Sequence, residues 1–361
     1  MTNLMTASQQ WASRPDDERY LSLADLKAAV EQRKDESWTL TTPVKDLRVG
    51  ADLTVEAYDI VQDQRRPLRP THWAFGQLAQ HAKAPAYYLR TLPAELAAIN
   101  LQWGLEHSPL RDESLILGQT NGSNALRSMT STSYGRIWDR QVVEAVERVN
   151  QDGRWQIPAS IYSTHHPKRA TTLYASDRDV FIFLVDPQHP VEINGETLFR
   201  GFYAWNSEVG SAVFGLTTFL YRYVCDNRII WGATDVQELR IRHTSGAPER
   251  FAYEGRQYLQ RYAEESSQRT VEAIKAAQSY EVPQADQAGK GWESWLKERG
   301  FTASQAKNAV NAALAEEGEA RSLWDIVNGL TASARQIPHT DERVKVETAA
   351  GKLMRHVTGA H

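Results

Sequence analysis

The segment that decides the fold runs from Thr197 to Trp231, TLFRGFYAWNSEVGSAVFGLTTFLYRYVCDNRIIW, and is the longest aromatic and β-branched stretch of the chain. Residues of these types favour strands that pack on the surface of a sheet. Two polar islands interrupt the segment, Asn-Ser-Glu at 206–208 and Asp-Asn-Arg at 226–228. Because polar groups on a packed surface need partners or a function, these islands are the first candidates for a site.

Strand-like runs continue on both sides of this segment, and most of them are joined by tight turns rather than by helices. Asn-Gly pairs at 121–122 and 194–195 each stand between two such runs, which is a strong hairpin signal. A short amphipathic helix is expected over 139–149, with Asp139 as its N-cap. The pattern predicts an α+β fold with a central antiparallel β-sheet and a short packed helix.

Helical patterns flank the predicted sheet. Ser22 is a good N-cap for a helix that ends near residue 35, and Thr71 is a good N-cap for another. The run over 75–92 has the outline of a helix-turn-helix, but its second helix offers only Arg90 to a base edge, so a scaffold role is favoured.

The C-terminal part is predicted to be helical throughout, beginning with one long amphipathic helix over 251–280. We therefore expect a mainly helical segment at 1–110, the central antiparallel domain at 111–250 and a helical region at 251–361.

Composition places the 361-residue chain among ordinary globular proteins, with 41% hydrophobic and 24% charged residues. Its net charge of −4 argues against a protein that coats nucleic acid through overall charge, although a local basic face is still allowed. A single cysteine permits no intrachain disulfide, which is typical of a reducing cytoplasm. We find no secretory signal pattern and no apolar run of membrane-spanning length, so a cytoplasmic location away from membranes is expected.

Motifs of the common catalytic and cofactor-binding classes are absent from the sequence. It has no phosphate-binding glycine loop, no GxSxG, no HExxH and no pair of cysteines. Cys225 stands in an apolar context and is expected to be a small buried hydrophobe. His165 and His166 are adjacent, so on a strand they would point to opposite faces and could not share one metal ion. The sequence thus predicts no cofactor, no metal site and no catalytic residue.

Arginine and aromatic residues are interleaved through the predicted sheet, and Lys168 is the only lysine between residues 121 and 262. The planar guanidinium pairs with phosphate, and aromatic rings stack on bases, so this composition is typical of a surface for single-stranded nucleic acid. Acidic residues nearly balance the arginines, however, so many of them could form ordinary ion pairs. The predicted nucleic-acid-binding residues are Lys168, Arg169, Arg222, Arg228, Arg240, Arg242, His243, Tyr203, Trp205 and Tyr223.

Two alternatives remain open. The first is a hydrolase or nuclease that uses Glu208, His243 and His165 around the Asn206 island, which requires these side chains to meet in one concave pocket. A purely structural interpretation of that island is a turn or β-bulge, in which Gly210 supplies backbone freedom. The second is a protein–protein interaction module, such as an inhibitor of a host defence, which requires the tryptophans to form one exposed apolar patch.

A longer pattern extends the first island. Asn-Ser-Glu-x-Gly is followed by an apolar strand and then by Arg-x-Val-Cys-x-Asn, and a Ser-x-x-Tyr precedes the short helix. The residues are Asn206, Ser207, Glu208, Gly210, Arg222, Val224, Cys225 and Asn227, with Ser131 and Tyr134 upstream. With this pattern the chain resembles the uncharacterised phage/plasmid-like protein family, a domain of unknown function found in prophages and plasmids. In that family a glycine often follows the Cys-x-Asn sequence, whereas this chain has Arg228 at that position.

The resemblance implies a mobile-element setting, in which replication, recombination and counter-defence functions are common, and it supplies no catalytic residue. We therefore predict a non-catalytic, phage- or plasmid-type protein that binds single-stranded DNA in replication, recombination or repair. Such a protein could assemble as a homo-oligomer or bind a protein partner.

Overall fold

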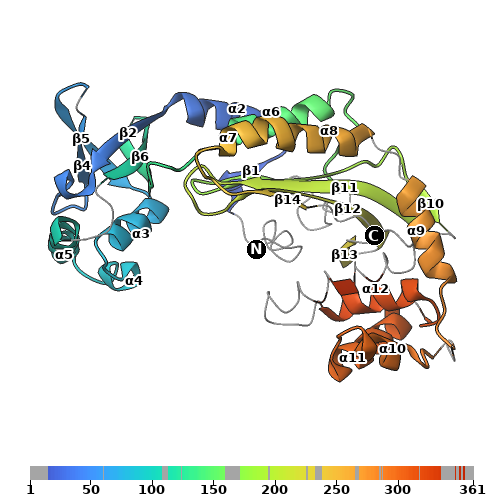
Figure 1. The fold of residues 1–361 in the computed structure, drawn as a ribbon. Helices are drawn as coiled ribbons and strands as arrows, with labels where there is room; N and C mark the ends of the chain where they lie inside the picture. The colour runs from blue at the N-terminus through green and yellow to red at the C-terminus, as the bar shows by residue number, and fades with distance from the viewer. Residues whose placement is uncertain are drawn as a thin grey trace.

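The computed structural model describes residues 15–59, 61–107, 113–122, 124–158, 171–193, 196–224, 227–231, 238–264, 268–283, 286, 288–316, 318–334, 346, 349–350 and 353. It confirms the α+β class: two largely antiparallel sheets are combined with helices, and the chain forms a large lobe and a small lobe (Figure 1). No helix within the described ranges is both long and apolar enough to cross a bilayer.

The large lobe is built on an eight-stranded sheet in which every pair of neighbouring strands is antiparallel. Its main path is β1 (Arg19–Tyr20), β8 (Leu173–Ala175), β9 (Val180–Val185), β11 (Glu196–Asn206), β12 (Phe214–Val224) and β13 (Asn227–Trp231). In addition, β10 (Val191–Ile193) pairs with β11, and β14 (Glu238–Ile241) pairs with β12. The segment that decides the fold therefore supplies the long β11–β12 hairpin at the centre of the sheet.

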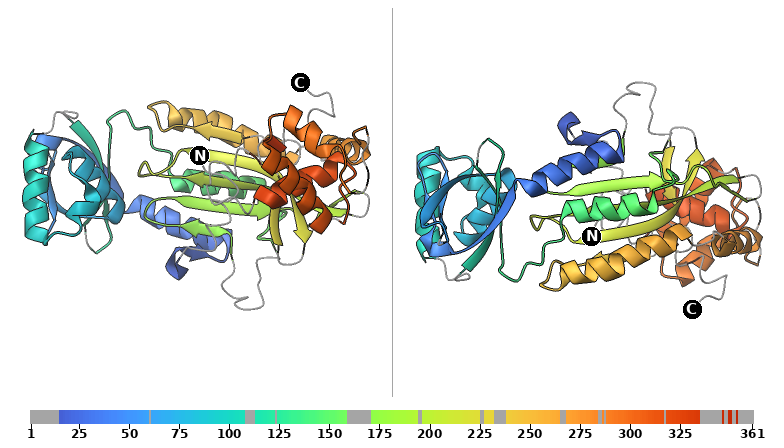
Figure 2. Two further views of the ribbon diagram at one scale, coloured as in Figure 1. Left: turned by 90° about the horizontal axis from the view of Figure 1, so that it is seen from below. Right: turned by 90° about the horizontal axis from the view of Figure 1, so that it is seen from above.

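Helices cover one face of this sheet. Viewed from above, α2 (Leu23–Asp35), α6 (Asp139–Val149) and α8 (Arg256–Glu264) lie side by side across it (Figure 2). The short helix α7 (Ala247–Arg250) and the π-helical turn η4 (Phe251–Gly255) lead into α8. Ser22 caps α2 as predicted, since its hydroxyl accepts from the N–H of Asp25 at 3.1 Å. Val142 and Phe202 belong to the buried core between these helices and the sheet.

The small lobe is inserted between α2 and α6 and holds a six-stranded sheet. Its strands, in spatial order, are β2 (Ser37–Pro43), β6 (Glu113–Thr120), β7 (Asn124–Thr130), β5 (Gln64–Pro70), β4 (Val55–Asp59) and β3 (Arg48–Val49). All its pairs are antiparallel except β5 with β7. Strands β6 and β7 lie beyond residue 110, the expected domain boundary, yet they pair with β2 and β5. The predicted hairpin at 121–122 joins β6 to β7, with Gly122 at a φ of 82°.

Three helices complete the small lobe, α3 (His72–His81), α4 (Ala86–Leu89) and α5 (Ala94–His107). The predicted cap at Thr71 is present, because its hydroxyl accepts from Ala74 N–H at 3.2 Å. Helix α4 is a single turn, and Leu78 and Leu101 of its neighbours are buried in the core of the lobe. A single turn is too short to serve as a recognition helix, so α3 and α4 do not form a helix-turn-helix DNA reader.

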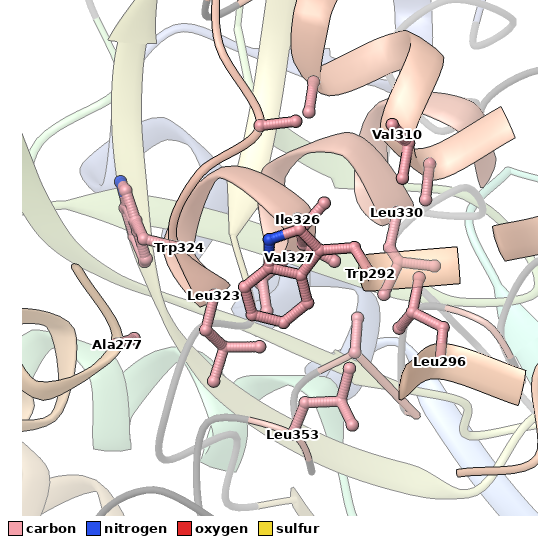
Figure 3. Close-up of a cluster of buried hydrophobic side chains, with 14 of the residues drawn as sticks. Ala277, Trp292, Leu296, Val310, Leu323, Trp324, Ile326, Val327, Leu330 and Leu353 are labelled. Atoms are coloured by element: carbon pink, nitrogen blue, oxygen red, sulfur yellow. The ribbon is translucent and has the colours of Figure 1, made fainter. Parts of the chain in front are cut away.

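The C-terminal helices form a separate core at the far end of the large lobe from the small lobe (Figures 1 and 2). They are α9 (Gln268–Ser279), α10 (Trp292–Glu298), α11 (Ala303–Glu316) and α12 (Leu323–Ala334). Trp292, Leu296, Ile326 and Leu330 gather around one another in this core (Figure 3). The predicted single helix over 251–280 is wrong, because α8 and α9 run in different directions (Figure 1).

Two short 3-10 helices complete the described elements, η1 (Asp16–Glu18) before β1 and η2 (Val44–Asp46) between β2 and β3. The predicted turn at 194–195 lies outside the described residues, as does most of the part after residue 334, where helix is also predicted.

Candidate functional site

The first polar island forms the turn between β11 and β12, at the end of the large sheet that meets the small lobe (Figure 1). The turn interpretation is confirmed, since residues 208–209 are a turn and Gly210 has a φ of 85°. Asn206, Ser207 and Glu208 are nevertheless at most 1% exposed. We call residues 206–211 and the side chains that hydrogen-bond them the interlobe joint.

Glu208 is the centre of the joint. Its carboxylate lies 2.8 Å from Nη2 of Arg127 on β7, and it accepts from the backbone N–H of Asp139 at 3.0 Å. The backbone carbonyl of Glu208 accepts from Nε of Arg136 at 2.8 Å. Because β7 belongs to the small lobe and α6 to the large lobe, one buried carboxylate holds both lobes. Removing one partner would leave a buried charge without its counter-charge, so this pairing stabilises the contact between the lobes.

Asn206 holds the start of α6. Its Nδ2 donates to the carbonyl of Ile137 at 2.8 Å and to Oδ1 of Asp139 at 2.7 Å. The other carboxylate oxygen of Asp139 lies 3.8 Å from Nη1 of Arg33 on α2. The predicted capping role of Asp139 is wrong, because Trp138 occupies the N-cap position and Asp139 is the first helical residue. Its carboxyl faces the joint because Asn206 and Arg33 are its partners there.

Ser207 fixes the β8–β9 turn to the joint. Its hydroxyl donates to the carbonyl of Arg178 at 2.6 Å, and the hydroxyl of Ser211 donates to the same carbonyl at 3.1 Å. The Ser207 oxygen also accepts from the N–H groups of Val209 and Ser211. The backbone of Arg178 is thereby held while its side chain stays exposed.

Tyr134 and His243 pack against the other side of the joint. The Tyr134 hydroxyl donates to the carbonyl of Ser207 at 2.8 Å, and burial raises the pKa of that hydroxyl, so it remains a donor. Its ring stacks on His243 with 4.8 Å between centroids, and Nδ1 of His243 lies 3.0 Å from the carbonyl of Gly135. Burial lowers the pKa of His243, and the charge of Arg136 acts in the same direction. The lowered pKa favours the neutral imidazole at neutral pH, which is unfavourable for the phosphate-binding role that the sequence predicts for His243.

A cleft of about 310 Å³ lies beside the joint, between α3 of the small lobe and the β8–β9 turn of the large lobe. Its lining residues are His72, Trp73, Gly76, Gln77, Gln80, Arg90 and Arg178. The indole N–H of Trp73 and Nε2 of Gln77 both donate to the carbonyl of Val209, at 2.9 and 2.8 Å. The α3 wall of the cleft is thus attached to the joint as well.

Two guanidinium groups reach this cleft from different lobes. Arg90 is exposed, donates to the carbonyl of His72 at 2.9 Å and lies over the ring of Phe75. Arg178 is exposed and has Nε 4.0 Å from a carboxylate oxygen of Asp177. Exposed arginines keep most of their donors available to a ligand, and a guanidinium pairs well with phosphate or carboxylate.

The predicted stacking residues of the sheet are not available as such. Side chains alternate between the faces of β11, so Tyr203 and Trp205 lie on the face opposite Phe202 and the covering helices. Both are 3% exposed and pack with Phe181 in an aromatic cluster. Trp205 lies over Gly215 on β12, where a Cβ atom would come within 1.9 Å of the indole ring. The base-stacking role expected of Tyr203 and Trp205 is therefore corrected to a packing role.

The predicted cationic residues are described only in part. Arg242 is exposed just after β14, whereas Arg240 is half-buried, with its guanidinium 5.9 Å from the centroid of the Trp205 ring. Arg222, Tyr223, Asn227 and Arg228 lie on β12 and β13, where only the backbone is described. Lys168, Arg169, His165 and Cys225 lie outside the described residues.

The enzyme alternative requires Glu208, His243 and His165 to meet in one pocket, and His165 lies outside the described residues. The Glu208 carboxylate is occupied by Arg127 and the Asp139 N–H, and neither Glu208 nor His243 lines the cleft. Within the described residues, no group of three His, Cys, Asp or Glu side chains is placed to hold a metal ion.

Sequence reasoning missed the cleft because its walls are far apart in the chain. Arg178 stands in an ordinary turn sequence, Ser-Asp-Arg-Asp at 176–179, and Trp73 in an amphipathic helix, so neither carries a motif. The polar islands are the one sequence signal that points toward the cleft. The first island forms hydrogen bonds to both walls of the cleft.

Asp139→Asn is expected to change the pH dependence of stability. Burial raises the pKa of the Asp139 carboxyl well above its ordinary value, and the charge of Glu208 adds to this. An unfolded aspartate has a pKa of about 3.9. Between that value and the raised pKa the folded state holds an extra proton, so the free energy of unfolding falls as pH rises. Asparagine does not titrate, so the Asn variant does not lose stability in this way. Its free energy of unfolding, measured by urea titration, should therefore rise relative to that of wild type as the pH increases above about 4.

The exposed Asp17 provides the matched control, because Asp17→Asn removes the same charge from the surface. If the free energy of unfolding of wild type and of Asp139→Asn changed with pH in parallel, the pKa of the buried Asp139 carboxyl would not be raised in the folded state.

Comparison with known proteins adds the family. A model described as a domain of unknown function (DUF932) matches residues 125–354, more than half of the chain. A search of curated proteins and a search of solved structures each found no match. The matched range starts in β7 and includes the first island and Arg178, whereas α3 and α4 precede it. The chain therefore belongs to the DUF932 family of proteins with a domain of unknown function.

Proposed function

We propose that this protein binds single-stranded nucleic acid, with DNA favoured, and does so without catalysis. The observation that carries the proposal is the interlobe cleft, into which Arg90 and Arg178 reach from different lobes beside the indole of Trp73. Cationic forks together with an aromatic ring are the combination that holds a phosphate backbone and an unstacked base.

The surface next to the cleft extends this chemistry. Tyr87 and Tyr88 of α4 are 84% and 55% exposed, and Tyr87 stands three residues before Arg90, on the same side of the helical turn. Exposed tyrosines can stack on bases of any sequence, which suits binding without sequence preference. The tyrosines of α4 thus take the role that the sequence assigned to Tyr203 and Trp205.

The exposed Arg242 could lengthen the binding surface at the same end of the large sheet, because β14 leads from the sheet toward the joint through His243. The contribution of Arg222, Arg228, Lys168 and Arg169 stays a prediction. A role in phage or plasmid replication, recombination or repair, in the cytoplasm and with a homo-oligomeric state, is part of this proposal and rests on the sequence resemblance alone.

The interaction-module alternative predicts one exposed patch of tryptophans. Among the tryptophans whose side chains are described, only Trp103 is more than half exposed; it shares the outer face of α5 with Leu96 and Ile99. This face could receive a protein partner. The buried Trp155, Trp292 and Trp324 do not contribute to such a patch, so nucleic-acid binding is the stronger conclusion.

Arg90→Ala combined with Arg178→Ala is expected to weaken binding of labelled single-stranded DNA, measured by fluorescence anisotropy at low and physiological salt. Each phosphate contact contributes about 0.7 to the slope of log affinity against log salt for a single strand. The double variant should therefore bind all sequences more weakly and reduce that slope by about 1.4.

Arg148→Ala is the matched control, since Arg148 is exposed near the far end of α6 from the joint. Arg240→Ala with Arg242→Ala tests whether the surface continues along β14. Absence of wild-type binding at low salt, where electrostatic attraction is strongest, would remove the proposed function.

A further inference from the structure

We infer that the interlobe cleft holds a single nucleotide through a terminal phosphate monoester, at a strand end or on a free nucleotide. This inference rests on the proposed function, because it concerns the same cleft. It adds the chemical form of the ligand, which the proposed function leaves open.

The size of the cleft supports one nucleotide rather than a length of strand. At about 310 Å³ it is at the lower limit of cavities that bind small ligands, about 300 Å³. A groove that follows several nucleotides would need a longer row of cations. Among the residues that the structure describes, Arg90 and Arg178 are the only lysine or arginine side chains that line the cleft. The exposed Tyr87 and Tyr88 lie outside its lining, where the following nucleotides of a strand could stack.

The charge of the cleft matches a monoester better than a diester. A phosphate monoester carries a charge of about −1.5 to −2 at pH 7 and three terminal oxygens, whereas a backbone diester carries one charge and two such oxygens. Two guanidinium forks approaching from opposite walls can each pair with the dianion. The carboxylate of Asp177 is 4.0 Å from Nε of Arg178 and competes with a ligand for that guanidinium. A dianion overcomes this competition better than a singly charged diester.

The interlobe joint explains why the two arginines are presented together. The hydroxyls of Ser207 and Ser211 hold the backbone of Arg178, and the carbonyl of Val209 holds Trp73 on the opposite wall. The same six-residue turn therefore sets the spacing of both walls. Ser207 and Val209 are positioning residues in this scheme, because they act through Arg178 and Trp73 and do not line the cleft.

The test compares oligothymidylates of one length that carry a 5′-phosphate, a 3′-phosphate or hydroxyls at both ends, with thymidine monophosphate and thymidine as competitors. An added charge-assisted contact should make at least one phosphorylated oligonucleotide bind about tenfold tighter than the hydroxyl form. Thymidine monophosphate should displace it, and thymidine should not. Arg178→Lys keeps the charge but loses the planar fork, so it should reduce the preference, and Arg90→Ala should abolish it.

Arg148→Ala should retain the preference, and thermal denaturation verifies that each variant is folded. Equal binding of all three oligonucleotides, with no competition by thymidine monophosphate, would overturn the inference while leaving the proposed function intact. If no oligonucleotide binds, the proposed function fails, and calorimetry with thymidine monophosphate decides the inference separately. Binding of the monophosphate that needs Arg90 and Arg178 would then support a free-nucleotide site, and no binding would overturn it.

Discussion

Glu208→Gln is expected to lower the free energy of unfolding by about 3–5 kcal/mol, because it leaves the buried Arg127 without its counter-charge. Glu208 and Arg127 are 1% and 2% exposed, and Oε2 of Glu208 lies 2.8 Å from Nη2 of Arg127. The glutamine can still accept from the Asp139 N–H, so the substitution isolates the loss of charge from the loss of shape. Urea denaturation monitored by tryptophan fluorescence measures the effect.

An exposed ion pair of nearly the same length provides the control. Arg250 and Glu254 are 2.7 Å apart on the surface, and Glu254→Gln should leave the unfolding midpoint almost unchanged because solvent screens such pairs. Adding Arg127→Met to Glu208→Gln removes the unpaired charge and should restore part of the lost stability. A cost for Glu208→Gln no larger than that for Glu254→Gln would contradict the account of the interlobe joint.

Trp292→Ala should destabilise the protein by about 3–5 kcal/mol, the usual range for a large aromatic side chain removed from a core. The Trp292 ring is fully buried among Leu296 and the α12 residues Ile326 and Val327 (Figure 3). Its indole N–H donates to the carbonyl of Arg321 at 3.1 Å, so the substitution also removes a hydrogen bond. Differential scanning calorimetry should show a lower melting temperature or a separate early transition of the C-terminal helices.

The same chemical change on the surface distinguishes packing from any general effect of losing a tryptophan. Trp103 is 64% exposed on α5, and Trp103→Ala should shift the melting temperature little. Comparable shifts for both substitutions would be inconsistent with a core centred on Trp292.

Local signals in the sequence were sufficient for many elements. Ser22 and Thr71 cap helices because a hydroxyl one residue before a helix can accept a free backbone N–H, whatever surrounds it. The Asn-Gly pair at 121–122 turns a hairpin because Gly122 adopts a positive φ at little cost. The prediction that Asp139 is an N-cap is wrong because the cap position lies one residue earlier, at Trp138, and the Asp139 carboxylate accepts from Asn206 instead.

The candidate site could be predicted only in part. The polar island at 206–208 was recognisable, because three polar residues inside an apolar stretch need partners. Their partners could not be foreseen: Arg127, Arg178 and Asp139 are all more than twenty-five residues away in the chain. Alternation along a strand places Tyr203 and Trp205 on one face, but whether that face is covered depends on the rest of the fold.

Sequence alone determined the α+β class, the central hairpin of β11 and β12, the caps at Ser22 and Thr71 and membership of a family of unknown function, since these depend on periodicity and on neighbouring residues. Tertiary structure alone decided that β6 and β7 join the small lobe, that the first polar island is an interlobe joint, and that Arg90 and Arg178 line the same cleft. The physical reason is that strand pairing and side-chain packing join residues far apart in the chain. A local pattern indicates that a polar or aromatic group needs a partner, but the identity of that partner depends on the tertiary structure.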